Sequence, residues 1–247
     1  MPQVGYRKGE IGATYRWWGD SGDFFTRITA SGNWDKTVEQ DGSPIEEEIE
    51  GSVTLWGPKQ SNTYLFYGIR DRYYEGKQFD QAFQGVDFEI NPIGNLEVGT
   101  YFRYDDRIDY AHARAAKGLN WLAYLHSSFG RNFRLTGQYK ILQLSVKGDR
   151  LFLTNTIDTT VIYQFNTRTF FRATFQFADI RRNQDIYAFA VEPITKDLFT
   201  QLLFSYKINP QTVLFLGYSD NYFGTLDCGI TQIDRTFFVK LGYAWVL

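Results

Sequence analysis

The chain has 247 residues, of which 18% are aromatic and 22 are glycine, and its formal net charge is −2. A net charge of −2 excludes a nucleic-acid-binding protein of the usual kind, because proteins of that class carry clustered Lys and Arg and a high pI. No apolar run approaches the roughly 20 residues of a helical membrane span, so none is expected. A membrane β-barrel remains open, because its strands are half polar.

Alternation of apolar and polar residues predicts about thirteen β-strands along nearly the whole chain. Each run is about ten residues long, the length that a tilted strand needs to cross a bilayer. No linker or low-complexity segment interrupts the pattern, so we expect one domain over residues 1–247. The expected strands lie near residues 10–18, 23–38, 45–56, 62–73, 80–90, 96–106, 119–129, 132–142, 153–164, 168–178, 197–207, 211–220 and 234–247.

Short turns rich in Gly, Pro, Asn and Asp alternate with longer polar connections, as in outer-membrane barrels. We predict that the short turns lie on one rim, the periplasmic one, together with the C-terminus, and the long loops on the other. The short turns centre on Ser21, Pro58, Pro92, Arg131, Thr167 and Pro210. The long connections are expected at 106–117, 145–149, 181–196 and 221–233.

The last expected strand carries an uninterrupted row of large apolar side chains at alternate positions. A soluble sheet edge of this kind invites aggregation, whereas a membrane strand presents such a row to lipid. The same stretch resembles the C-terminal assembly signal of outer-membrane barrels, although such signals mostly end in Phe or Trp and this chain ends in Leu. The sequence therefore predicts the barrel-assembly machinery as a partner, bound through Lys240, Gly242, Tyr243, Trp245 and Leu247.

Strand and turn patterns from about residue 119 onward carry a family resemblance. They occur at 119–121, 134–140, 163–166, 202–210, 214–219 and 234–243. Together they resemble the C-terminal outer-membrane β-barrel region of an uncharacterised bacterial family, which joins a family-nine-type carbohydrate-binding-like module to a barrel. The resemblance implies that this chain is the C-terminal portion of a larger protein whose N-terminal part is missing here. It supplies no catalytic residues.

Charged residues of both signs fall on the face that we expect to line the barrel lumen. Two interpretations stay open: a polar lumen that contacts hydrated solutes, or internal ion pairs that fill and stiffen a narrow barrel. The acidic run at 46–50 is expected to be a solvated rim rather than a divalent-cation site. The expected lumen-lining residues are Arg16, Arg27, Arg70, Arg103, Arg134, Lys140, Asp158, Arg172, Lys207 and Lys240.

No catalytic, cofactor or metal site is predicted. The chain has two histidines, His112 and His126. His126 is followed by Ser127 and Ser128, but neighbouring strand positions point to opposite faces and do not assemble a catalytic pair. No phosphate loop and no metal-spaced Cys/His cluster is present. We therefore expect a protein that is not an enzyme and has no cofactor.

The sequence thus predicts an all-β, antiparallel, up-and-down transmembrane barrel of about 12–14 strands in the bacterial outer membrane. Its expected role is structural or porin-like, for hydrated small solutes and with a link to carbohydrate. Outer-membrane lipid and a small solute or saccharide are its other expected partners. The alternative is a soluble all-β carbohydrate-binding module or a propeller-like binding domain. Because bacterial barrels usually have an even strand count, we also expect a fragment, unless residues 10–18 pair with 234–247.

Overall fold

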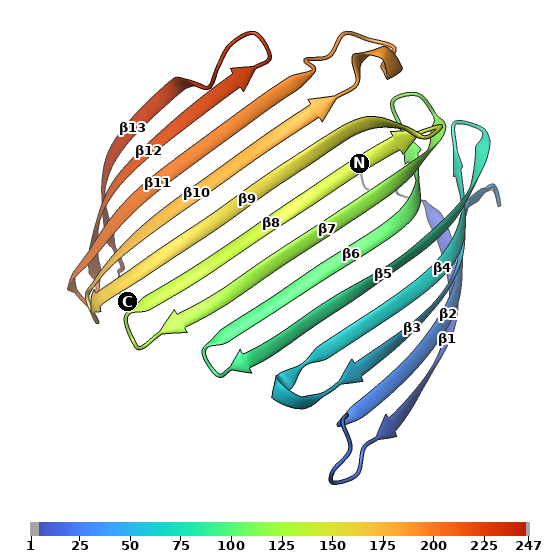
Figure 1. The fold of residues 1–247 in the computed structure, drawn as a ribbon, viewed down its shortest axis with the longest axis horizontal. Helices are drawn as coiled ribbons and strands as arrows, with labels where there is room; N and C mark the ends of the chain where they lie inside the picture. Colours follow the sequence, from blue (N-terminus) through green and yellow to red (C-terminus); the bar gives the residue numbers. More distant parts are fainter. Residues whose placement is uncertain (1–4, 246–247) are drawn as a thin grey trace. The chain divides into compact units, whose positions relative to one another are not determined.

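The computed structural model describes residues 5–245 and is almost entirely β-strand. Thirteen strands lie in one sheet in the order of the chain, each hydrogen-bonded to its sequence neighbours (Figure 1). The strands pair antiparallel from β1 to β5 and from β9 to β13. The all-β, up-and-down organisation and the thirteen predicted strands are confirmed.

Most strands are longer than predicted by a few residues at their ends, whereas β2 begins at Arg27 rather than near residue 23 and is shorter than predicted. Two short 3₁₀ turns, η1 (Pro58–Gln60) and η2 (Gln184–Ile186), are the helical segments of the described residues. None of these is long and apolar enough to cross a membrane. The strands are β1 (Tyr6–Trp18), β2 (Arg27–Glu39), β3 (Pro44–Trp56), β4 (Asn62–Tyr74), β5 (Lys77–Ile93), β6 (Leu96–Asp109), β7 (Arg114–Phe129), β8 (Phe133–Val146), β9 (Asp149–Asn166), β10 (Thr169–Arg182), β11 (Ile194–Asn209), β12 (Thr212–Thr225) and β13 (Thr231–Tyr243).

The chain divides into two compact units. The first unit holds Met1–Asn91, Gly99–Trp121 and Leu142–Arg150, and therefore β1 to β4 and most of β5. The second unit holds Pro92–Val98, Leu122–Ile141 and Leu151–Leu247, and therefore β10 to β13. The single-domain prediction stays a prediction.

The prediction of long connections is wrong in two places, and the connection predicted at 221–233 is reduced to residues 226–230. Between β6 and β7 only residues 110–113 lie outside the strands, and between β8 and β9 only Lys147 and Gly148, both with positive φ. The charged residues that suggested a loop at 106–117 lie at strand ends and pair across strands instead, as Lys117 does with Asp106. The connection at 183–193, which contains η2, is long as predicted.

In the second unit, the tight turns lie beside one another along one edge. Backbone hydrogen bonds join each turn to the next: Ser128 N to Asn95 O (2.9 Å), Gln164 N to Asn132 O (2.6 Å), Lys207 N to Arg168 O (2.8 Å) and Ala244 N to Gln211 O (2.9 Å). The predicted shared edge is thus confirmed there for the turns at Pro92, Arg131, Thr167 and Pro210 and for the C-terminal end of β13. The connections 183–193 and 226–230 join the opposite ends of those strands.

The sheet of the first unit has two unlike faces. On one face, which we call the charged face, a single row runs across five strands and is charged at four positions: Glu10, Asp35, Glu48, Arg70 and Gln81. The alternate positions place Ile11, Trp34, Ile49 and Ile69 in a row on the other face. The three isoleucines are 49–69% exposed. An exposed apolar face therefore backs the charged one.

The second unit repeats this division. Tyr163, Phe171, Phe204, Leu216 and Val239 stand opposite one another across β9 to β13 and form the apolar face. Val239 is 74% exposed. The other face, called the polar face, carries the row Asp158, Gln176, Phe199, Asn221 and Asp234. By register and alternation, the apolar face also carries Phe175, Phe177, Leu241 and Tyr243.

The strand order begins with β1 and ends with β13, and no ladder joins these two in the described residues. The described residues therefore lack the continuous hydrogen-bond ladder between β1 and β13 that a closed barrel requires. The expectation that further strands precede this chain stays a prediction.

Candidate functional site

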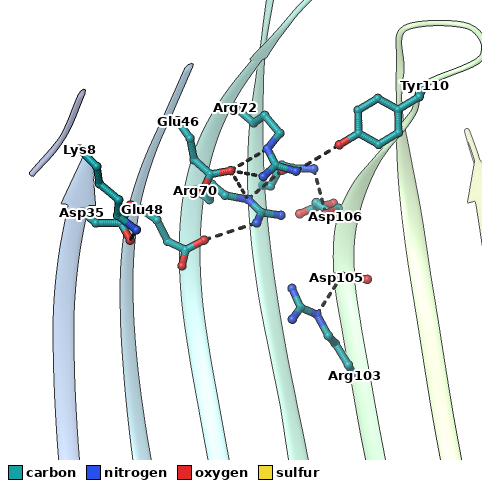
Figure 2. Close-up of polar contacts among 11 residues, drawn as sticks. Lys8, Asp35, Glu46, Glu48, Arg70, Arg72, Arg103, Asp105, Asp106 and Tyr110 are labelled. Atoms are coloured by element: carbon teal, nitrogen blue, oxygen red, sulfur yellow. Dashed lines mark hydrogen bonds and ion pairs between the residues drawn. The ribbon is translucent and has the colours of Figure 1, made fainter. Parts of the chain in front are cut away.

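Arginines and carboxylates of neighbouring strands bind one another on the charged face of the first unit. Figure 2 shows Arg70 and Arg72 of β4 directed toward the carboxylates of Glu46 and Glu48 on β3. Arg70 Nη1 lies 3.4 Å from Glu48 Oε2, and Arg70 Nε donates to Gln81 Oε1 at 3.1 Å. Arg72 Nε donates to Glu46 Oε2 at 2.6 Å, and its Nη1 donates to the hydroxyl of Tyr110 at 3.1 Å.

Two further arginines share one buried carboxylate. Asp105, 4% exposed, accepts from Arg103 Nε at 2.9 Å and from Arg107 Nε at 2.8 Å. The guanidinium of Arg103 also lies 4.8 Å from the ring centroid of Phe83, within cation–π range. Each of these cations is therefore already held by a carboxylate or a ring.

Asp35 sits between two other carboxylates in the same row. Its cross-strand neighbours are Glu10 on β1 and Glu48 on β3. Like charges directly opposite one another are destabilising, and Lys8 offsets this repulsion. Lys8 Nζ lies 3.0 Å from Asp35 Oδ2 and 3.9 Å from Glu10 Oε2. The dense pairing favours the stiffening interpretation for this face.

The pair of Arg70 and Glu48 gives a direct test of that interpretation. Both side chains are 16% exposed. Arg70→Met or Glu48→Gln alone should lower the free energy of unfolding by about 1–3 kcal/mol, because the first leaves the desolvated carboxylate of Glu48 without its arginine and the second removes a carboxylate from the desolvated Arg70. The double variant should lose less than the sum of the two, as measured by urea titration in micelles. Strictly additive losses would show that the two side chains do not interact.

The acidic run at 46–50 lies within β3, and alternation divides it between the faces. Glu46 and Glu48 are 20% and 16% exposed, so the predicted solvated rim is wrong for them. Glu47 points to the opposite face, where its carboxylate accepts from Lys36 Nζ (2.8 Å) and Trp34 Nε1 (3.0 Å). Sequence reasoning missed the partners of this run, although the register of the β3–β4 hairpin would have identified Arg70 and Arg72.

Arg16 and Arg27 lie toward the other end of the charged face. The guanidinium of Arg27 lies 3.6 Å from the ring centroid of Trp56 and 5.5 Å from that of Trp18. Arg16 stands opposite Thr29 on β2 and is exposed. Aromatic rings rather than carboxylates thus hold Arg27.

The polar face of the second unit contains a hollow of about 520 Å³. Its lining combines amides, carboxylates and one lysine with aromatic and aliphatic residues, Phe199 among them. Gln138 Nε2 donates to Asp158 Oδ2 at 2.9 Å, and Asn221 Nδ2 donates to Asp234 Oδ1 at 2.7 Å beside it. Among its lining residues are Gln138, Lys140, Thr156, Asp158, Gln176, Asp197, Phe199 and Asn221.

The other predicted lumen residues of this unit also fall on or beside the polar face. Arg172 Nη2 donates to Gln201 Oε1 at 3.2 Å. Arg134 lines a smaller hollow of about 240 Å³ with Ile162 and Gln164. Lys207 stands opposite Val213, and Lys240 opposite Phe215. In the described part of this unit, the predicted cations Arg134, Lys140, Arg172, Lys207 and Lys240 make no ion pair within 4.0 Å.

The histidine and serine of β7 bind different partners. His126 Nδ1 lies 3.2 Å from Glu97 Oε1, whereas Ser127 Oγ donates to the backbone oxygen of Asn95 at 3.1 Å. His112 Nδ1 lies 2.8 Å from Asp109 Oδ2. Residues 5–245 contain no group of three or more His, Cys, Asp or Glu arranged to hold a metal. That the protein is not an enzyme remains a prediction.

The predicted assembly signal lies on and just after the edge strand β13. Lys240 and Gly242 belong to the strand, and the rings of Tyr243 and Trp245 meet edge to face with centroids 5.3 Å apart. Trp245 is 86% exposed. Leu247 lies outside the described residues.

No protein-family model matches the chain, and no curated protein matches it in sequence. Solved structures with a similar arrangement include OmpT of Vibrio cholerae, expressed in the outer membrane (11% identity, 97% of each chain covered, TM-score 0.44). A bacterial polysaccharide outer membrane secretin is 8% identical over 96% of this chain and 79% of its own (TM-score 0.48). The NanC porin is 10% identical over 96% and 99% (TM-score 0.35). These likenesses are too low to carry an argument, so the functional proposal rests on the chain's own residues.

Proposed function

We propose that this protein is an outer-membrane β-barrel protein with a transport or channel-type role for hydrated small solutes. The observation that carries the proposal is the division of faces: in each unit, the same strands present an exposed apolar row on one face and a polar or charged row on the other. Lipid is the solvent that an apolar face of this kind requires, and water or solute the one that a polar face requires.

The exposed apolar rows argue against the soluble binding module. Val239, Leu241 and Tyr243 of β13 are 54–74% exposed and continuous with the exposed Leu216 of β12. A soluble monomer rarely leaves such a patch uncovered, because burying it elsewhere is favourable. A bilayer covers it without a second protein layer.

The apolar face of the second unit also ends where a membrane boundary would be expected. Along β10, Phe171, Phe175 and Phe177 are followed on the same face by Asp179 and Arg181, which pair at 3.0 Å. Along β12, Leu216 and Tyr218 are likewise followed by Asp220, which pairs with Arg235 at 3.2 Å. Both pairs lie toward the strand ends joined by the longer loops, which supports a hydrocarbon-facing band nearer the tight turns.

We also propose that the barrel-assembly machinery binds β13. This strand is an edge of the sheet in the described residues, and its side chains are almost all exposed. An edge strand offers unpaired backbone groups to a partner strand. Lys240, Gly242, Tyr243 and Trp245 are the described residues of the predicted signal.

Detergent dependence and solute flux test the proposed function together. The protein folded in detergent should precipitate when detergent is removed, and should make lipid vesicles permeable to small sugars and salts. Vesicles prepared with heat-denatured protein are the control. A chain that stays monomeric without detergent and leaves vesicles sealed would support the soluble binding module instead.

A further inference from the structure

We propose that the hollow on the polar face of the second unit binds a neutral polyhydroxylated solute, such as a sugar. This inference rests on the proposed function only in taking the polar face to be the one that meets solute. Its core is a cross-strand row of four lining residues on β9 to β12: Asp158, Gln176, Phe199 and Asn221. Phe199 thus stands between two amides, and a carboxylate stands on the strand beyond Gln176.

The polar groups of the row match the hydrogen bonding of sugar hydroxyls. Each hydroxyl both donates and accepts, so its site needs acceptors and donors side by side. An amide supplies both, and an ionised carboxylate has about four lone-pair positions. Gln138 Nε2 occupies one of these on Asp158 at 2.9 Å and orients the carboxylate. The remaining capacity of Asp158 and both groups of the Gln176 amide are available to a solute.

Phe199 supplies the apolar surface that a sugar ring also needs. It stands directly between Gln176 and Asn221 and lines the hollow. A half-buried phenyl ring covers C–H groups at low entropic cost, because its side chain has only two rotatable bonds. Leu198, the neighbour of Phe199 on β11, and Ile233 also border the hollow and add apolar atoms to the lining.

The charge of the lining favours a neutral solute over an anion. Lys140 contributes one positive charge and Asp158 and Asp197 two negative ones, so the net is 1 − 2 = −1. No arginine lines the hollow, so the planar fork that recognises carboxylate and phosphate is missing from this lining. Anionic solutes would meet two carboxylates and a single lysine.

Charged groups of the first unit are paired with one another, whereas the carboxylates that line the hollow are not ion-paired among the described residues. There Arg70, Arg72 and Arg103 are all bound by carboxylates. In the described residues of the hollow, neither Asp158 nor Asp197 forms an ion pair within 4.0 Å. Hydrogen-bonding capacity left open in this way is what a solute requires.

Calorimetric titration of the full chain, folded in detergent micelles, tests the inference with maltose as probe and gluconate as its charged counterpart. Maltose should bind, and gluconate should bind at least about tenfold more weakly. Phe199→Ala and Asp158→Asn should each weaken maltose binding about tenfold, equivalent to about 1.4 kcal/mol. Phe215→Ala is the matched control, because Phe215 shares the polar face but does not line the hollow.

Circular dichroism of each variant establishes that it is folded before titration. No maltose binding by the folded protein, equally tight binding of gluconate, or equal weakening by Phe215→Ala would overturn the inference. Vesicle flux distinguishes this failure from that of the proposed function: permeable vesicles without maltose binding would refute the sugar site alone. Binding by a chain that stays soluble without detergent would refute the membrane role alone.

Discussion

Val239→Arg should lower the free energy of unfolding in lipid bilayers by about 2–4 kcal/mol, the cost of arginine at mid-depth on a lipid-facing surface. Val239 stands opposite Leu216 on the apolar face and is 74% exposed. The guanidinium would have to enter hydrocarbon or reach its boundary from there. Urea titration of the protein in vesicles measures the difference.

Lys240→Arg is the matched control, because it places the same side chain one position along β13 on the other face. Lys240 stands opposite Phe215 on the polar face. A cation already occupies this position, so folding yield in vesicles should stay close to that of the unchanged protein. Equal losses for the two variants would show that the faces are wrongly assigned to lipid and water.

Phe83→Ala should lower the free energy of unfolding by about 3–5 kcal/mol, the usual cost of truncating a buried phenylalanine. Phe83 is 4% exposed and stands opposite Gly68. Its ring lies over that glycine so closely that a Cβ on Gly68 would overlap it. The ring also contacts the guanidinium groups of Arg70 and Arg103, 5.7 and 4.8 Å from its centroid. Urea titration in micelles measures the loss.

Phe88→Ala provides the comparison for Phe83, because it removes the same side chain from the other face of β5. By alternation Phe88 lies on the apolar face, opposite Thr63. Detergent can fill the space that it leaves, so its loss should be much smaller. A loss as large as that of Phe83→Ala would mean that Phe88 is packed against protein rather than detergent.

Strand number and facing could be predicted from the sequence because both depend on local alternation. The row containing Phe171 and the position of Arg172 follow from the period of two along β10, independent of tertiary detail. Strand ends could not be predicted in the same way. Asp106 and Lys117 are charged residues of a kind common in loops when each is considered alone. Only their ion pair across β6 and β7 shows that the two strands continue through them.

The candidate sites were predictable as a face but not as particular contacts. Alternation placed Arg70, Arg103 and Asp158 on the expected faces. It could not show that Arg70 meets Glu48, which depends on the register of the β3–β4 hairpin. Nor could it distinguish the paired charges of the first unit from the open hydrogen-bonding groups around Phe199, because both sets have the same polar pattern in sequence.

The consecutive strand order has a consequence for how quickly the protein reaches its fold. Every strand pairs with its neighbour in sequence, and most connections are only two to five residues long. Short connections keep loop-closure entropy small, so hairpins can add one after another at low contact order. The β10–β11 hairpin, closed by residues 183–193, carries the largest closure entropy among the connections between described strands. Growth of the sheet is therefore expected to pause there, with two shorter meanders forming on either side before they join.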